Sequence, residues 1–135
     1  MPTLAFSNAQ STATGATVTS TSFTPQTGDI IVVKTASEDG GGTVANTPTG
    51  GGWTYTSRVS DSITGHTGCK LWTAPVTAGG TAQTVAVTWG GTAPGHASMV
   101  VELWRSAQLA ATPATCDARG SGAPSTPLTD RKSVV

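Results

Sequence analysis

The stretch TPQTGDIIVV, residues 24–33, decides the fold of this chain. Its first half predicts a tight turn, because Pro25 presets φ and Gly28 supplies a positive φ. Its second half is apolar at four consecutive positions, Ile30 to Val33, which is typical of a strand that is covered on both faces. We therefore expect a turn that leads into a central strand of a β-sheet.

Short runs with a period-two alternation of apolar and polar residues lie on both sides of this stretch, separated by Gly, Pro or Asn clusters. No segment has a convincing helical periodicity. Many short strands at this spacing predict an all-β fold, an antiparallel two-sheet β-sandwich of Ig-like or jelly-roll-like type. Seven strands are expected, at Thr3–Ala9, Ala16–Phe23, Asp29–Ser37, Trp53–Asp61, Cys69–Thr73, Gln83–Trp89 and Ala97–Arg105.

The same alternation predicts which side chains form the core. Trp53, Tyr55 and Val59 fall on one face of their strand, so we expect them to point inward. The Gly-rich and polar segment 38–52 is expected to be a surface crossover or a binding loop without regular structure.

Length and charge exclude several classes of protein. A chain of 135 residues is long enough for one core and not for two. Seven Lys plus Arg balance seven Asp plus Glu, so the basic surface that nucleic acid requires is missing. No apolar run approaches the roughly 20 residues of a membrane span, and the start MPTLAFSNAQ lacks the features of an export signal. We expect neither nucleic acid nor a membrane as partner.

The composition changes along the chain. We interpret residues 1–107 as the β-sandwich domain and residues 108–129 as an extended segment rich in Pro, Gly, Ser and Thr. Residues 130–135, DRKSVV, can be encoded by the beginning of a common sequencing adapter, so we interpret them as an adapter-derived tail. A C-terminal strand is then expected to be missing, which would leave an unpaired edge beside Asp29–Ser37 or Ala97–Arg105.

Few residues offer chemistry for catalysis or metal binding. His66 and Cys69 have the spacing of half a zinc site, but the other half is missing, and we expect Cys69 to be a buried free thiol. Neither His66 nor His96 lies in a sequence that resembles a nucleophile elbow. Asp29, Glu38, Asp39 and Asp61 offer oxygen ligands for calcium, without the order of a known binding loop. We therefore expect no enzyme activity, no metal and no cofactor.

The tryptophans carry the sharper hypothesis. Trp53 and Trp89 alternate with core positions and are expected to pack inside. Trp72 and Trp104 are core residues if the second sheet covers their face, and ligand or subunit contacts if that face is open to solvent. The candidate binding residues are therefore Trp72 and Trp104, together with the polar residues Arg58, Glu38 and Asp39.

Four motifs resemble a known family. PQTGDIIVV, GGGWTYTS, GCKLWTAPVTAGGTAQTVAVTW and HASMVVELWRSA occur in this order, and they resemble a β-sandwich domain of structural proteins from tailed phages of actinobacteria. The match covers roughly residues 20–107, and Arg105-Ser106-Ala107 stands where the family usually has an Arg-Gly turn.

The resemblance implies a non-enzymatic structural or adhesion module of a virion, either a capsid decoration protein or a minor tail protein. Its partners would be other virion proteins or a host-surface glycan, and it would be assembled in the host cytoplasm. A homo-oligomer is also expected. The alternatives are a carbohydrate-binding module that uses exposed tryptophans and an extracellular bacterial adhesin-type domain.

Overall fold

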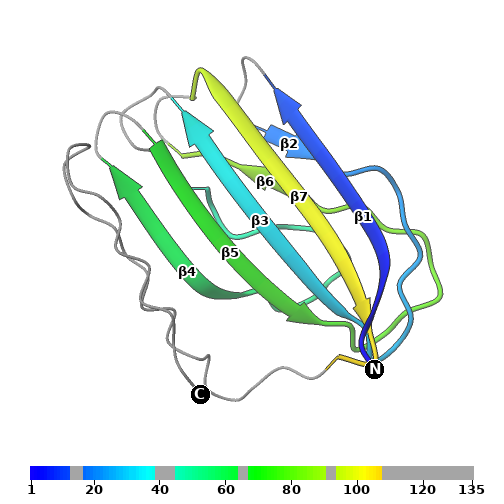
Figure 1. Ribbon diagram of the computed structural model, residues 1–135. Helices are drawn as coiled ribbons and strands as arrows, with labels where there is room; N and C mark the ends of the chain where they lie inside the picture. The colour runs from blue at the N-terminus through cyan, green and yellow to red at the C-terminus, as the bar shows by residue number, and fades with distance from the viewer. Residues whose placement is uncertain (13–16, 39–44, 64–66, 91–93, 108–135) are drawn as a thin grey trace, which may run out of the picture.

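The computed structural model describes residues 1–12, 17–38, 45–63, 67–90 and 94–107 (Figure 1). All of its regular elements are strands, which confirms the all-β prediction. Within the described residues, no helix is long and apolar enough to cross a membrane. The strands are β1 (Thr3–Thr12), β2 (Thr17–Thr19), β3 (Ile30–Glu38), β4 (Thr56–Ile63), β5 (Thr67–Pro75), β6 (Ala86–Thr88) and β7 (His96–Arg105).

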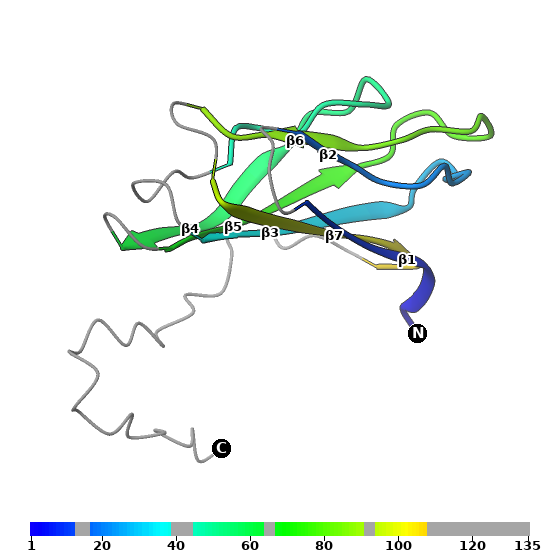
Figure 2. The ribbon, with the colours of Figure 1, turned by 90° about the horizontal axis from the view of Figure 1, so that it is seen from above.

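The strands form two antiparallel sheets. The large sheet has the order β1-β7-β3-β5-β4, and the small sheet consists of β2 and β6. Figure 2 shows the small sheet as a second layer over one face of the large sheet. We call this covered face the inner face and the opposite one the outer face. The prediction of a two-sheet sandwich is confirmed, and so is the central position of the strand that contains residues 30–33.

The core lies between the inner face and the small sheet. Alternate residues of β3, β5 and β7 point inward, as period-two packing requires, and they meet apolar side chains from β2, β6 and the segments beside them. The core includes Val18, Ile31, Val33, Trp53, Trp72, Val85, Val87, Trp89, Met99, Val101 and Leu103, which are all at most 8% exposed.

The turn before β3 forms as the sequence predicts. Gly28 has a φ of 89°, a conformation that only glycine adopts without strain. The carboxylate of Asp29 accepts a hydrogen bond of 2.8 Å from the backbone N–H of Gln26. The same buried carboxylate lies 3.5 Å from Nε of Arg105. The turn thus ties the start of β3 to the end of β7.

The prediction that Val59 points inward is wrong, because β4 contains an irregularity. Ser57 lies opposite Trp72 and Val59 lies opposite Leu71, so Arg58 is an extra residue between two pairs. A bulge of this kind shifts the alternation by one position. Val59 therefore lies on the outer face and is 42% exposed.

The segment 38–52 is more regular than the sequence predicts. Residues 39–44 lie outside the described residues, but Ala45 and Thr49 form bridges to Trp89 and Ala86 beside β6. The backbone N–H of Thr49 donates to the carbonyl of Ala86 at 2.9 Å, and that of Asn46 donates to Thr88 at 2.8 Å. This part of the predicted loop is instead the neighbour of β6, because the small sheet has an open edge there.

The predicted location of an unpaired edge is also wrong. β3 pairs with β5 and β7, and β7 pairs with β1 and β3, so both are interior strands. The edges of the large sheet belong to β1 and β4. The predicted extended segment 108–129 and the tail 130–135 lie outside the described residues.

Candidate functional site

The outer face of the large sheet is an ordered array of side chains, because antiparallel partners point to the same side. The strand register arranges these side chains in rows that cross the sheet. From one end to the other, the rows are Leu4–Trp104–Ile30–Pro75, then Ser7–Glu102–Val32–Thr73–Thr56, then Ala9–Val100–Lys34–Leu71–Val59, and then Ser11–Ser98–Ala36–Cys69–Asp61.

Several apolar side chains lie on this face. In Figure 2 both described strands of the small sheet lie on the opposite side of the large sheet, so they do not cover it. Six apolar side chains lie close together in its first three rows, and we call them the outer patch. The outer patch consists of Leu4, Val32, Val59, Leu71, Val100 and Trp104, of which Leu4 is 50% and Val59 is 42% exposed and the others are partly buried.

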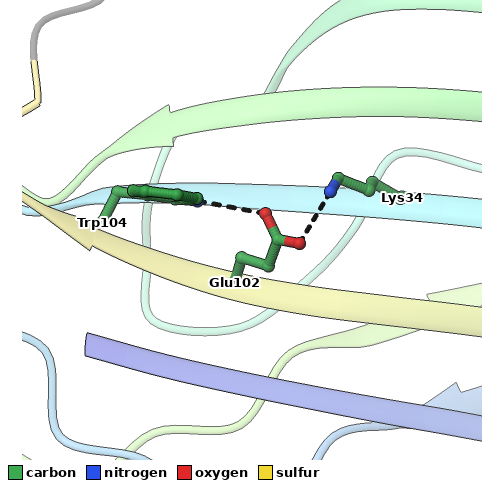
Figure 3. A network of polar contacts seen from close by, with 3 residues as sticks. All are labelled: Lys34, Glu102 and Trp104. Atoms are coloured by element: carbon green, nitrogen blue, oxygen red, sulfur yellow. Dashed lines mark hydrogen bonds and ion pairs between the residues drawn. The ribbon is translucent and has the colours of Figure 1, made fainter. Parts of the chain in front are cut away.

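A polar network occupies the middle of the outer patch (Figure 3). The ammonium of Lys34 on β3 donates to Oε1 of Glu102 on β7 at 2.7 Å. The indole Nε1 of Trp104 donates to Oε2 of the same carboxylate at 3.0 Å. Both oxygens of Glu102 are therefore engaged, and the indole of Trp104 is held against the sheet.

The electrostatics of Glu102 follow from this geometry. Burial raises the pKa of Glu102, but the hydrogen bonds from Lys34 and Trp104 and the positive charge of Lys34 lower it, and the lowering prevails. The carboxylate is thus ionised at neutral pH. The Lys34 side chain is 47% exposed, so its ammonium also remains open to a partner.

Of the predicted binding residues, Trp104 and Arg58 lie on this face. The guanidinium of Arg58 donates through Nε to Oγ1 of Thr73 at 2.7 Å, and Thr73 is buried beneath it. Glu38 is the last residue of β3 and is exposed opposite His96 and Thr67, away from the outer patch. Asp39 lies outside the described residues.

Trp72 is placed in the core, not at the surface. It lies opposite Val33 on the inner face and is 1% exposed, and the ammonium of Lys70 lies 5.0 Å from its ring centroid. The structure therefore separates the two candidate tryptophans. Trp53 and Trp89 are packing residues, as predicted, so Trp104 is the one of the four tryptophans on the outer face.

The end of the large sheet where β3 finishes has a hollow of about 580 Å³. Glu38, Asp61, Cys69 and His96 contribute to its lining. The prediction that Cys69 is buried is wrong, because its place in the register puts it on the outer face, although it is free as expected. His66 and Cys116 lie outside the described residues.

The described residues hold no group of three or more His, Cys, Asp or Glu side chains that could bind a metal ion. Of the calcium candidates, Asp29 accepts a hydrogen bond within the turn before β3. Asp29 precedes the first residue of β3, whereas Glu38 is the last residue of that strand. This separation prevents the two carboxylates from sharing a cation.

The sequence prediction did not include Lys34 and Glu102. The available signal was a charged residue within an otherwise apolar strand, in IIVVK and in VVELW.

In comparisons with protein families, characterised proteins and solved structures, no family, protein or structure matches this chain.

Proposed function

We propose that this chain is a non-enzymatic structural or adhesion module that binds another protein through its outer face. The observation that carries the proposal is the outer patch around the Lys34–Glu102–Trp104 network. An apolar patch on the surface is typical of a protein interaction site. Tryptophan and arginine are enriched in such sites, and here Trp104 and Arg58 lie on the same face.

The module belongs in this proposal to a phage virion, as a capsid decoration protein or a minor tail protein. The support is the resemblance of residues 20–107 to a β-sandwich domain of actinobacteriophage structural proteins. The all-β fold agrees with that resemblance. The partner would then be another virion protein, and the outer face would contact the particle surface.

Carbohydrate binding is the second candidate, and the positions of the aromatic residues weigh against it. A sugar-binding face of a sandwich would present several aromatic rings in a planar row. Among the described residues, Trp104 has no second aromatic ring beside it to form such a row. Trp53, Trp72 and Trp89 are at most 8% exposed, and Phe6 and Tyr55 pack against the core. A single ring beside an ion pair favours a protein partner over a glycan. An adhesin-type domain would use the same face for a host protein.

The test uses the full chain and phage particles from the source of the sequence. An antibody against the recombinant protein should label the capsid or the tail in electron micrographs. Leu71→Glu places a charge in the outer patch and should weaken binding of added protein to particles by at least about tenfold, or about 1.4 kcal/mol. Thr17→Glu, at an exposed position of β2, is the matched control and should bind as the wild type does.

Two results would overturn the proposal. One is an absence of label on particles while the protein stays in the particle-free fraction of the lysate. The other is binding to a glycan array that disappears in Trp104→Ala, which would assign the face to a carbohydrate.

A further inference from the structure

The edge strand β1 has neither a charge nor a proline to protect it. Its ten residues, TLAFSNAQST, contain no charged residue and no proline. Natural sheets protect their edges with charges, prolines, bulges or covering segments, because unpaired N–H and C=O groups recruit other strands. β1 has one irregularity, between Leu4 and Phe6, and it leaves the stretch from Phe6 to Ser11 regularly paired with β7.

The opposite edge of the same sheet is protected. β4 carries the charged residues Arg58 and Asp61, and a bulge at Arg58 interrupts its pairing with β5. Both edge strands contain a bulge, but of the two only β4 carries charges, so the edge of β1 is the less protected one.

The free side of β1 has the geometry of an acceptor for another strand. In an antiparallel ladder every second residue directs both its N–H and its C=O away from the partner. Among the described residues, no backbone hydrogen bond joins the stretch from Phe6 to Ser11 to anything except β7. Asn8 does accept a bond from the N–H of Thr21 at 3.0 Å, but through its side chain, on the inner face.

We infer that the free edge of β1 pairs with β1 of a second copy of this chain. A two-fold axis perpendicular to the sheet makes two identical edge strands antiparallel, which is the arrangement of every other pair in the sheet. The two large sheets then form one continuous sheet across the dimer. A second copy is the occupant that an uncharged strand fits, because a strand with several charges of one sign would repel its own copy and β1 carries none.

The side chains of the stretch are compatible with this pairing. Ser7, Ala9 and Ser11 are small and point to the outer face, and Asn8 and Gln10 point to the inner face. Phe6 is the bulky side chain of the stretch, and it packs against the core on the inner face. The inference goes beyond the proposed function, because it uses the edge and leaves the outer patch open to its own partner.

A charge-swap experiment tests the pairing in the full-length protein. Light scattering after size-exclusion chromatography should find the wild type as a dimer. Ser7→Lys/Ala9→Lys and Ser7→Glu/Ala9→Glu should each raise the dissociation constant at least about tenfold, since each brings like charges together. An equal mixture of the two variants should dimerise again. Thr56→Lys on the opposite edge is the control and should leave the dimer intact.

Hydrogen exchange adds a readout that is specific for edge pairing. At higher protein concentration, every second amide between Phe6 and Ser11 should exchange more slowly, because only those N–H groups point to the new strand.

The inference is overturned if the wild type is a monomer at about 100 μM, which lies toward the weak end of specific association. It is also overturned if the mixture dimerises no better than either charged variant alone. If Leu71→Glu abolishes the dimer and the charges on β1 do not, the second copy sits on the outer face instead. Loss of particle binding in Leu71→Glu with an intact dimer concerns the proposed function alone, so the two failures are distinguishable.

Discussion

The contact between Gly51 and Trp53 allows a sharp test of the core. Gly51 has a φ of 63°, and a Cβ atom at this position would overlap the ring of Trp53, which is 8% exposed. Gly52 has a similar φ of 67°, and outside its chain neighbours Gly51 and Trp53 a Cβ atom there meets nothing within 4 Å. The replacements Gly51→Ala and Gly52→Ala therefore share the cost of a positive φ, and Gly51→Ala adds the overlap with the Trp53 ring.

The magnitudes follow from these two terms. A left-handed conformation costs an L-residue about 1–2 kcal/mol, and alanine regains part of it, about 0.4–1 kcal/mol, because the unfolded chain is less flexible. Forcing extra atoms into a packed core costs about 1–3 kcal/mol more. We expect Gly52→Ala to lower the free energy of unfolding by about 1 kcal/mol and Gly51→Ala by about 2–4 kcal/mol.

Urea denaturation followed by tryptophan fluorescence and by circular dichroism measures both changes. A double-mutant cycle adds the decisive control, because the extra cost of Gly51→Ala should disappear in a Trp53→Ala background. Equal losses for Gly51→Ala and Gly52→Ala would refute the packing of Trp53 over this turn. An extra loss that persists without Trp53 would do the same.

Three further outcomes are expected. Trp53→Ala should lower the free energy of unfolding by about 3–5 kcal/mol, the range for emptying a large aromatic site, and a change in the melting temperature of only a degree would show that Trp53 is exposed. The fold lowers the pKa of Glu102, so the ionised carboxylate stabilises the folded protein. This contribution to the free energy of unfolding is complete above the ordinary glutamate pKa of about 4.3, and it is lost as the pH falls through the lowered pKa of the folded protein. Lys34 is half exposed, so Glu102→Gln should cost at most about 1 kcal/mol at neutral pH, and an unchanged acid-denaturation profile would contradict the network. Burial raises the pKa of Tyr55, the single tyrosine, so the stability due to its neutral form should be lost as the pH rises above about 10; tyrosinate absorbance should then increase together with unfolding, and an increase in the folded protein would contradict this burial.

Local sequence determined the elements of this fold. Val87, Met99 and Val101 lie in the core, in agreement with the alternation in residues 85–89 and 99–103, because consecutive side chains of a strand point to opposite faces. The four apolar residues after the turn give β3 its central position, since an interior strand of a sandwich tolerates apolar residues on both sides. These properties depend on neighbours within a few residues.

Tertiary structure decided where the candidate site lies. The alternation of apolar and polar residues shows that Trp72 and Trp104 each follow an apolar residue. It cannot show whether the second sheet covers the face on which each tryptophan lies. The register of β5 against β3 turns Trp72 toward the small sheet, and that of β7 against β3 brings Glu102 within 2.7 Å of Lys34, 68 positions away in sequence. A one-residue bulge at Arg58 reversed the prediction for Val59, because in a period-two pattern a shift of one position exchanges the two faces.

The sequence by itself thus determined that the chain forms strands, roughly where they lie, and which one is central, because these follow from local alternation and turn chemistry. Only the tertiary structure decided which tryptophan lies on the outer face, which charges pair, and that β1 and β4 are the edges. Those features depend on strand order and register, which are set by contacts between residues distant in the chain.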